Sequence, residues 1–202
     1  MHFPVPLEVR AVSDGLRKEG FEAYLVGGCV RDLLLSREPK DWDVTTNAKP
    51  EDIQRIFPES FYENEFGTVG VKTGSKEPKL AVIEVTPYRT ETGYSDKRRP
   101  DEVIFGESLE DDLARRDFTI NAIALDESKG HLVDPYKGQV DIEARVLRTV
   151  GNAEDRFEED GLRLMRAVRL VAELEFALDA DTAAAIQNKG QNLKLISRER
   201  IR

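Results

Sequence analysis

The apolar and polar positions of the chain predict alternating helices and strands over its first three quarters. Apolar residues recur with helical spacing in some segments, and in others they alternate or form the short apolar runs that are typical of strands. In order, the pattern predicts helix, strand, helix, strand and helix at residues 5–19, 23–26, 29–35, 41–45 and 50–57. Residues 67–73 and 80–87 then alternate like the two arms of a β-hairpin around a polar turn.

Further along the chain the pattern changes twice. Residues 89–101 are polar, contain glycine and proline and have no periodic apolar face, so we expect a mobile loop there. A charged helix and three short strands follow, at residues 108–116, 121–126, 131–134 and 145–149. From Ala153 onward the spacing is helical. The sequence therefore predicts an α+β fold, in which residues 1–150 form a head domain with a mixed, partly antiparallel sheet and flanking helices, and residues 151–202 form an all-α neck.

The composition is that of an ordinary soluble globular protein, with 40% hydrophobic and 34% charged residues. No apolar run is long enough to cross a membrane and the N-terminus has no signal-peptide pattern, so we expect a cytoplasmic protein without a membrane partner. The single cysteine, Cys29, excludes an internal disulfide and most structural zinc sites. We expect Cys29 to be a small core residue.

The net charge of −9, from 30 basic and 39 acidic residues, is unusual for a protein that binds nucleic acid. Net charge describes solubility and steering, however, whereas local patches decide phosphate binding. Basic clusters occur at residues 97–99, 115–116, 163–169 and 198–202. Each of these clusters is also compatible with an ordinary solvated surface.

The segment GGCVRDLLLSREPKDWD at residues 27–43 is the most informative for chemistry. Its glycine pair lets the backbone turn sharply after a buried strand, and the amides at the start of the next helix favour phosphate oxygens. Asp41 and Asp43 are spaced so that on a strand they project from one face, while Trp42 points into the fold. Two adjacent carboxylates repel each other unless a cation lies between them, and Mg²⁺ prefers such oxygen ligands and also bridges nucleotide phosphates. A glycine pair alone is more often a plain turn, and an Asp-x-Asp pair alone is more often a solvated strand end.

This segment resembles the signature of the class II tRNA nucleotidyltransferases and the related bacterial poly(A) polymerases, which belong to the polymerase-beta-like nucleotidyltransferase superfamily. Later segments resemble the family's successive motifs in the same order: RRDFTINA at 115–122, DPYKG at 134–138 followed by Asp141, EDGLRLMRAVR at 159–169 and SRERI at 197–201. The resemblance extends from about residue 22 to the C-terminus.

The resemblance implies attack by the 3′-hydroxyl of a polynucleotide on the α-phosphate of a nucleoside triphosphate, with release of pyrophosphate. Asp41 and Asp43 would be the catalytic metal ligands for Mg²⁺. Glu84, a charged residue in an otherwise apolar strand, falls where relatives carry a third acidic group, although on a two-faced sheet a solvated glutamate is the more common reading.

Several further residues gain expected roles in nucleotide binding from the resemblance. The residues expected to hold the triphosphate are Gly28, Arg31 and Arg116. We expect Asp32 and Asp117 to orient these two arginines, and Asn121 to contact the sugar.

For base selection, the resemblance assigns Asp160 and Arg163, which lie three positions apart on one helix face. Cytosine and adenine both present an amino donor beside a ring-nitrogen acceptor, so an aspartate next to an arginine complements them and mismatches uracil and guanine. Such a pair is also a common helical ion pair. Arg166 and Arg169 continue this stripe as auxiliary nucleotide contacts, and we expect the core-facing side of the helix to be formed by Leu162, Met165 and Val168.

The leading functional hypothesis is template-independent addition of CCA, from CTP and ATP, to the acceptor end of tRNA. Within the same chemistry the alternatives are addition of CC only, addition of A only, and poly(A) synthesis. The full-length segment at 89–101 resembles that of complete CCA-adding members. A non-catalytic nucleotide sensor or RNA-binding module on the same fold is the alternative from another functional class.

The chain stops at Arg202, inside the last motif of the family. The resemblance implies a helical body and tail that grip tRNA beyond this point, so we expect a truncated chain with weak tRNA affinity that falls further with salt. The sequence leaves the oligomeric state open.

Overall fold

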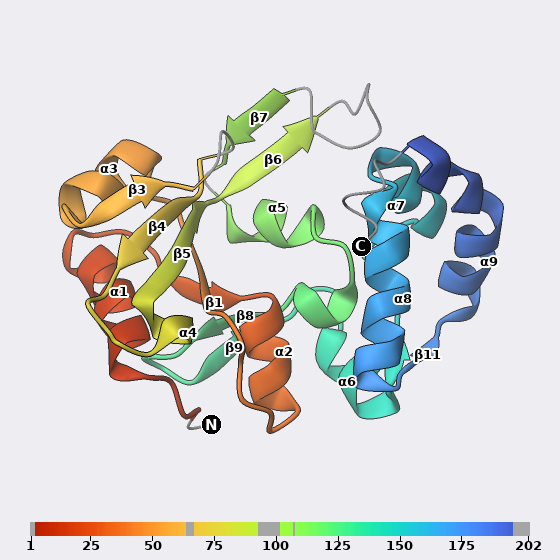
Figure 1. Ribbon diagram of the computed structural model, residues 1–202, viewed down its shortest axis with the longest axis horizontal. Coiled ribbons are helices and arrows are strands. Elements are labelled where there is room, and N and C mark those ends of the chain that lie inside the picture. The colour runs from red at the N-terminus through yellow and green to blue at the C-terminus, as the bar shows by residue number, and fades with distance from the viewer. Residues whose placement is uncertain (1–2, 64–66, 93–101, 107, 196–202) are drawn as a thin grey trace.

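A mixed seven-stranded sheet with helices around it forms the larger part of the molecule, and three helices of the C-terminal segment lie to one side of it (Figure 1). The computed structural model describes residues 3–63, 67–92, 102–106 and 108–195. The arrangement confirms the predicted α+β fold. No helix in these described ranges is long and apolar enough to cross a membrane.

The strands of the large sheet have the order β3-β4-β5-β2-β1-β8-β9. Their bounds are β1 Tyr24–Val26, β2 Asp43–Thr46, β3 Ser60–Tyr62, β4 Val69–Lys72, β5 Val82–Pro87, β8 Ala124–Asp126 and β9 His131–Val133. All neighbours pair antiparallel except β2 and β5, which are parallel. The predicted hairpin of β4 and β5 is confirmed, whereas the short edge strand β3 was not predicted.

The helices that surround this sheet come from every part of the chain. Their bounds are α1 Leu7–Lys18, α2 Gly28–Leu34, α3 Pro50–Ile56, α4 Pro78–Ala81, α5 Leu109–Ala114, α6 Gly138–Ala144, α7 Ala153–Glu159, α8 Leu162–Leu174 and α9 Ala180–Lys189. Two 3-10 helices, η1 and η2, span Thr119–Asn121 and Gly190–Leu195. The predicted helices at 5–19, 29–35, 50–57 and 108–116 correspond to α1, α2, α3 and α5.

The two faces of the sheet differ sharply in polarity. One row of directly paired residues crosses β4, β5, β2, β1 and β8 and is wholly buried and apolar: Val69, Val85, Val44, Leu25 and Leu125. The adjacent row, which faces the other way, reads Phe61, Gly70, Glu84, Asp43, Val26 and Ala124 from β3 to β8. The apolar face carries the main core, which includes the fully buried Cys29 as expected, and the second face presents carboxylates.

The segment that was predicted as a loop contains strand structure instead. Strand β6 (Arg89–Thr92) pairs antiparallel with β7 (Glu102–Phe105) in a separate two-stranded ribbon. Such a ribbon is held by backbone hydrogen bonds and needs no periodic apolar face, which is why the polar pattern hid it. Residues 93–101, including the basic cluster at 97–99, lie outside the described residues, as does the cluster at 198–202.

The C-terminal segment is mainly helical but not purely so. A short strand, β11 (Ala177–Leu178), pairs in parallel with β10 (Val146–Leu147), which precedes the expected boundary at residue 150. This contact ties the C-terminal segment to the preceding one, so the expected all-α character does not extend to β11. The domain boundary itself stays a prediction.

Candidate active site

The glycine pair forms the tight turn between β1 and α2. Gly27 has φ +76°, a conformation that L side chains rarely adopt. A Cβ atom there would lie 3.1 Å from an Arg116 guanidinium nitrogen and 3.4 Å from Asp43 Oδ2. At Gly28 the nearest atoms would be Arg31 Nη2 at 3.6 Å and Asp41 Oδ1 at 3.7 Å. The turn therefore places bare backbone against both carboxylates of the Asp-x-Asp pair and against two arginines.

The Asp-x-Asp pair lies at the start of β2 with the predicted alternation, because Trp42 is buried while Asp41 is exposed and Asp43 is partly buried. Burial, followed by the negative charges of Glu84 and Asp41, raises the pKa of Asp43 to about 7. The positive charges of Arg116 and Arg166 act in the opposite direction but do not offset this effect. Asp43 thus lies in a site that is short of positive charge.

The donor set fits a divalent cation that is shared with substrate. Among the residues that the structure describes, no group of three or more His, Cys, Asp or Glu side chains forms a metal-binding cluster. Mg²⁺ is commonly held by only one or two carboxylates together with water and substrate phosphates, which matches a pair better than a closed cage.

Glu84 is the residue paired with Asp43 on the neighbouring strand, so both side chains project from the same face of the sheet. Glu84 is exposed to solvent, but part of its side chain is shielded from water. This shielding, followed by the negative charges of Glu63 and Asp41, raises the pKa of Glu84. The structure places Glu84 beside the pair, and its role as a third catalytic acid stays a prediction.

A cleft lies between the glycine turn and α8 and consists of two cavities of about 390 and 400 Å³. Both cavities are lined by Gly28, Asp43, Asn121 and Arg166. The other expected site residues are divided between the two cavities. The cavity of about 390 Å³ is also lined by Arg31, Asp41 and Arg169, and the cavity of about 400 Å³ by Arg116, Asp160 and Arg163. The fold therefore brings every expected nucleotide-binding residue to one cleft, with Glu84 outside its lining.

Two acidic residues hold the arginines of the head, and one of them was not expected. Arg31 Nε and Nη2 donate to Asp32 Oδ1 at 2.9 and 2.8 Å, as predicted. Arg116 is held by Asp112, which accepts from its Nη2 at 3.0 Å and also accepts from Arg115 Nη2 at 2.6 Å. The helical i,i+4 spacing from Asp112 to Arg116 is the sequence signal that would have shown this pair.

Asp117 was predicted to orient Arg116, and this was wrong. Its carboxylate accepts from Arg166 Nε at 2.6 Å and from Asn121 Nδ2 at 3.2 Å. Asn121 Oδ1 accepts from Arg31 Nη1 at 2.9 Å, so both ends of the Asn121 amide are engaged within the protein. The expected sugar contact of Asn121 would require one of these bonds to be shared.

The start of α8 presents the residues expected to select the base. Arg163 is buried, and its Nη1 donates to Glu159 Oε2 at 2.5 Å while its Nη2 donates to the Arg115 carbonyl at 3.3 Å. Asp160 Oδ1 accepts from the backbone N–H of Leu162 at 2.9 Å, which satisfies a donor at the helix start. Glu159 thus holds the Arg163 guanidinium, a contact that the sequence analysis did not predict.

The core-facing side of α8 was predicted wrongly. Val168 is 56% exposed, and Leu162 and Met165 are only half-buried. The apolar stripe that packs into the core consists of Leu164, Ala167, Leu170 and Leu174. Arg163 occupies a buried position of its own, so the helix is rotated from the expected orientation and its arginines border the cleft.

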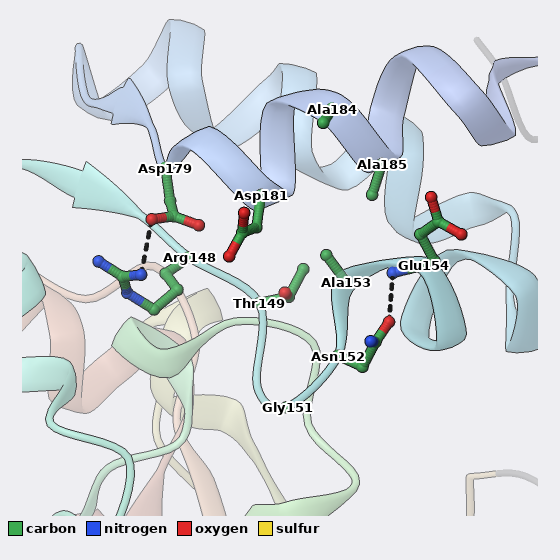
Figure 2. A pocket seen from close by; sticks show the side chains of 10 residues that line it. All are labelled: Arg148, Thr149, Gly151, Asn152, Ala153, Glu154, Asp179, Asp181, Ala184 and Ala185. Atoms are coloured by element: carbon green, nitrogen blue, oxygen red, sulfur yellow. Dashed lines mark hydrogen bonds and ion pairs between the residues drawn. The ribbon is translucent and has the colours of Figure 1, made fainter.

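A third cavity of about 500 Å³ lies away from this cleft, between the β10–α7 connection and α9 (Figure 2). The side chains that Figure 2 labels include Arg148, which donates to Asp179 at 2.6 Å, and Asn152, which caps α7. None of the expected site residues lines it.

The model of the Poly A polymerase head domain family matches residues 23–148. The chain belongs to this family. It is 48% identical over 192 residues to the CCA-adding enzyme of Lactobacillus delbrueckii subsp. bulgaricus, covering 95% of this chain and 47% of that protein. With the CCA-adding enzyme of Geobacillus stearothermophilus the identity is 47% over 200 residues, covering 96% of this chain and 47% of that protein.

Solved structures of the family agree with this assignment. The crystal structure of Bacillus stearothermophilus CCA-adding enzyme in complex with CTP matches with a TM-score of 0.85 and 45% identity, covering 98% of this chain and 47% of that one. A tRNA nucleotidyltransferase complexed with a primer tRNA and an incoming ATP analog matches with a TM-score of 0.74 and 32% identity, covering 94% of this chain and 53% of that one. The chain thus spans about half the length of these relatives.

Proposed function

We propose that the chain is the nucleotide-transferring part of an enzyme that adds CMP and AMP, from CTP and ATP, to the 3′ end of tRNA without a nucleic-acid template. The relatives named as CCA-adding enzymes, and the likeness to a CTP complex, support this proposal. The proposal places the reaction in the cytoplasm, where tRNA and nucleoside triphosphates are both present.

The observation that carries the proposal is the cleft itself, where the glycine turn, the carboxylate pair of Asp41 and Asp43 and the five expected arginines meet. The reaction is an in-line attack of the RNA 3′-oxygen on the α-phosphorus, with pyrophosphate as the leaving group. The Gly28 amide, Arg31 and Arg116 hold the triphosphate, because backbone N–H groups and guanidinium forks match phosphate oxygens.

Asp41 and Asp43 are the residues that would hold Mg²⁺, and Glu84 lies beside them as the third acid. When bound, Mg²⁺ would lower the pKa of the attacking hydroxyl and neutralise charge on the phosphates. The protein's own contribution is positioning: Asp32 and Asp112 keep two arginines in place before the substrate arrives, so no reorganisation is needed in the transition state.

Base choice in this proposal rests on Asp160 and Arg163. Arg163 is fixed by Glu159 and by the Arg115 carbonyl, so its guanidinium has little freedom to turn toward a different base. A cytosine or adenine edge matches one acceptor beside one donor, whereas uracil or guanine leaves polar groups mispaired. Arg166 and Arg169 supply further contacts to the nucleotide.

The direct test is extension of a tRNA that ends at the discriminator base, with CTP and ATP supplied singly and together in MgCl₂. We expect two additions with CTP alone and three with both. Stopping at two with both triphosphates would identify a CC-adding enzyme, addition of A only to RNA ending in CC would identify an A-adding one, and long A tracts would identify a poly(A) polymerase. Nucleotide binding without any transfer would contradict the proposal in favour of a sensor.

A further inference from the structure

The sheet face that carries Asp43 continues beyond the cleft. On the side of Asp43 away from α8, the same row of paired residues runs through Glu84 and Gly70 to Phe61 on the edge strand β3. Figure 1 shows β3, β4 and β5 on one side of the molecule and α7 and α8 on the other, and the strand order places β3, β4 and β5 on one side of β2. Phe61 and Gly70 line neither cavity of the nucleotide cleft.

Phe61 lies on this face with its ring folded back over the neighbouring strand. A Cβ atom on Gly70 would be 2.7 Å from the ring Cζ, so only glycine lets the ring lie this close to the β4 backbone. The side chain is 37% exposed. Lys72 Nζ is 5.7 Å from the ring centroid, and Val82, which is paired with Lys72 on this face, is 36% exposed.

This surface has the composition of a single-stranded RNA contact. An aromatic ring accepts any base by stacking, and a nearby lysine attracts the phosphate backbone. Glu63 and Glu84 on the same face repel phosphates, so the RNA backbone is favoured on the Lys72 side of the ring.

The position also suits the reaction. In the proposed reaction the triphosphate lies between the glycine turn and α8, and in-line attack places the 3′-oxygen opposite the leaving pyrophosphate. The acceptor end would then reach Asp43 from the β5 side, where Glu84 is exposed. Neighbouring strands are about 4.8 Å apart, so the Phe61 ring, folded over β4, lies roughly 10 Å from the β2 backbone at Asp43. A terminal nucleotide whose 3′-oxygen is at Asp43 can place its base on a ring at that separation.

We propose that the Phe61 ring is the stacking platform for the terminal base of the RNA strand that is extended, and that the exposed Lys72 ammonium, which lies over the ring, turns to a phosphate when the base stacks. The inference rests on the proposed nucleotidyl transfer and adds the surface that receives the acceptor end. Phe61 is a binding residue in this account, and it takes no part in the choice between CTP and ATP.

The experiment compares full-length protein carrying Phe61→Leu with wild type, and uses Tyr62→Leu as the matched control. Tyr62 is an exposed aromatic on the same strand, but it belongs to the row that faces the opposite way. We expect Phe61→Leu to raise the KM for the RNA about 10-fold while the KM for CTP stays within twofold, because stacking on one aromatic ring has about that effect. Tyr62→Leu should leave both constants unchanged, and Phe61→Trp should restore the low KM for RNA.

An RNA whose terminal nucleotide lacks its base separates stacking from a purely structural role. For wild type, removing the base should raise the KM for RNA about 10-fold. For Phe61→Leu, whose KM for RNA is already raised, removing the base should cause no further increase. Equal sensitivity of both proteins to the missing base, or an unchanged RNA KM in Phe61→Leu, would overturn the platform. If wild type adds no nucleotide at all, the proposed function fails first, so the two failures are distinguishable.

Discussion

The glycine turn and the region around α5 and η1 both contain carboxylates close to arginines, yet their electrostatics are opposite. Burial and neighbouring acids raise the pKa of Asp43 to about 7. Burial also acts to raise the pKa values of Asp112 and Asp117, but the charges and hydrogen bonds of their arginines outweigh it and hold both below the ordinary value.

This difference separates two uses of an aspartate. Asp112 and Asp117 are satisfied within the protein, so they position Arg115, Arg116 and Arg166 and have little capacity for a ligand. Asp43 is left with excess negative charge, which would stabilise a bound cation rather than the fold. Arg166 is anchored through its Nε atom, which leaves its Nη groups for a phosphate, whereas Arg116 is anchored through one Nη nitrogen.

The largest effect on stability is expected from removing an anchored carboxylate. Asp112→Ala leaves two arginines and the Thr45 hydroxyl without their shared partner, and should lower the free energy of unfolding by about 3 kcal/mol. Urea unfolding measures this loss. Asp111→Ala, on the exposed side of the same helix, is the control and should change stability by less than about 0.5 kcal/mol. Similar losses in the two variants would show that Asp112 is not a structural anchor.

A smaller loss is expected from Asp117→Asn, which keeps the shape but removes the charge that faces Arg166. The free energy of unfolding should fall by about 2 kcal/mol, since a charge-assisted hydrogen bond becomes a neutral one. Nucleotide affinity should fall as well, because Arg166 loses its orientation. Calorimetric titration with CTP would check this, and unchanged affinity would mean that Arg166 does not need Asp117.

The opposite sign is expected for Asp43→Asn in metal-free buffer. The raised pKa means that folding favours the protonated acid, so the wild-type carboxylate weakens the fold progressively as the pH rises from about 4 to about 7. The variant should therefore match wild type below pH about 4 and be more stable by roughly 1–3 kcal/mol at pH 8. Unfolding curves in EDTA at both pH values decide this, and destabilisation at pH 8 would contradict the assigned electrostatics.

The smallest stability effect is expected at the exposed edge of the cleft. The Arg169 side chain is 78% exposed, and its ion pair with Glu173 is long, at 3.9 Å. Arg169→Ala should therefore change the unfolding free energy by less than about 0.5 kcal/mol. CTP affinity should still fall a few-fold if this side chain contacts the nucleotide. Identical CTP affinity in the variant would remove Arg169 from the site.

Local spacing was sufficient to predict the elements and residues whose partners are near in sequence. The buried strand, the glycine turn and the alternation of Asp41, Trp42 and Asp43 all follow from short-range geometry, and the structure shows them as predicted. The helical stripe of Arg163, Arg166 and Arg169 also reached the expected cleft.

Partners that are distant in sequence could not be predicted in the same way. Asp117 follows Arg116 directly, but its carboxylate meets Arg166, which the fold brings in from α8. The prediction of the orientation of α8 was wrong for a related reason. Arg163 is buried, with its guanidinium donating to the Arg115 carbonyl, and this orientation of the helix leaves Val168 exposed. Strand β6 depends on pairing with β7, which its polar sequence does not reveal.

The central claim is that the uncompensated charge of Asp41 and Asp43 holds a divalent cation at the glycine turn. Binding of Mn²⁺ in the presence of CTP, followed by electron paramagnetic resonance, tests it in wild type, Asp43→Asn and the control Asp111→Asn. The account predicts that affinity falls at least about 10-fold in Asp43→Asn and stays unchanged in Asp111→Asn. Equal Mn²⁺ affinity in all three proteins would contradict it.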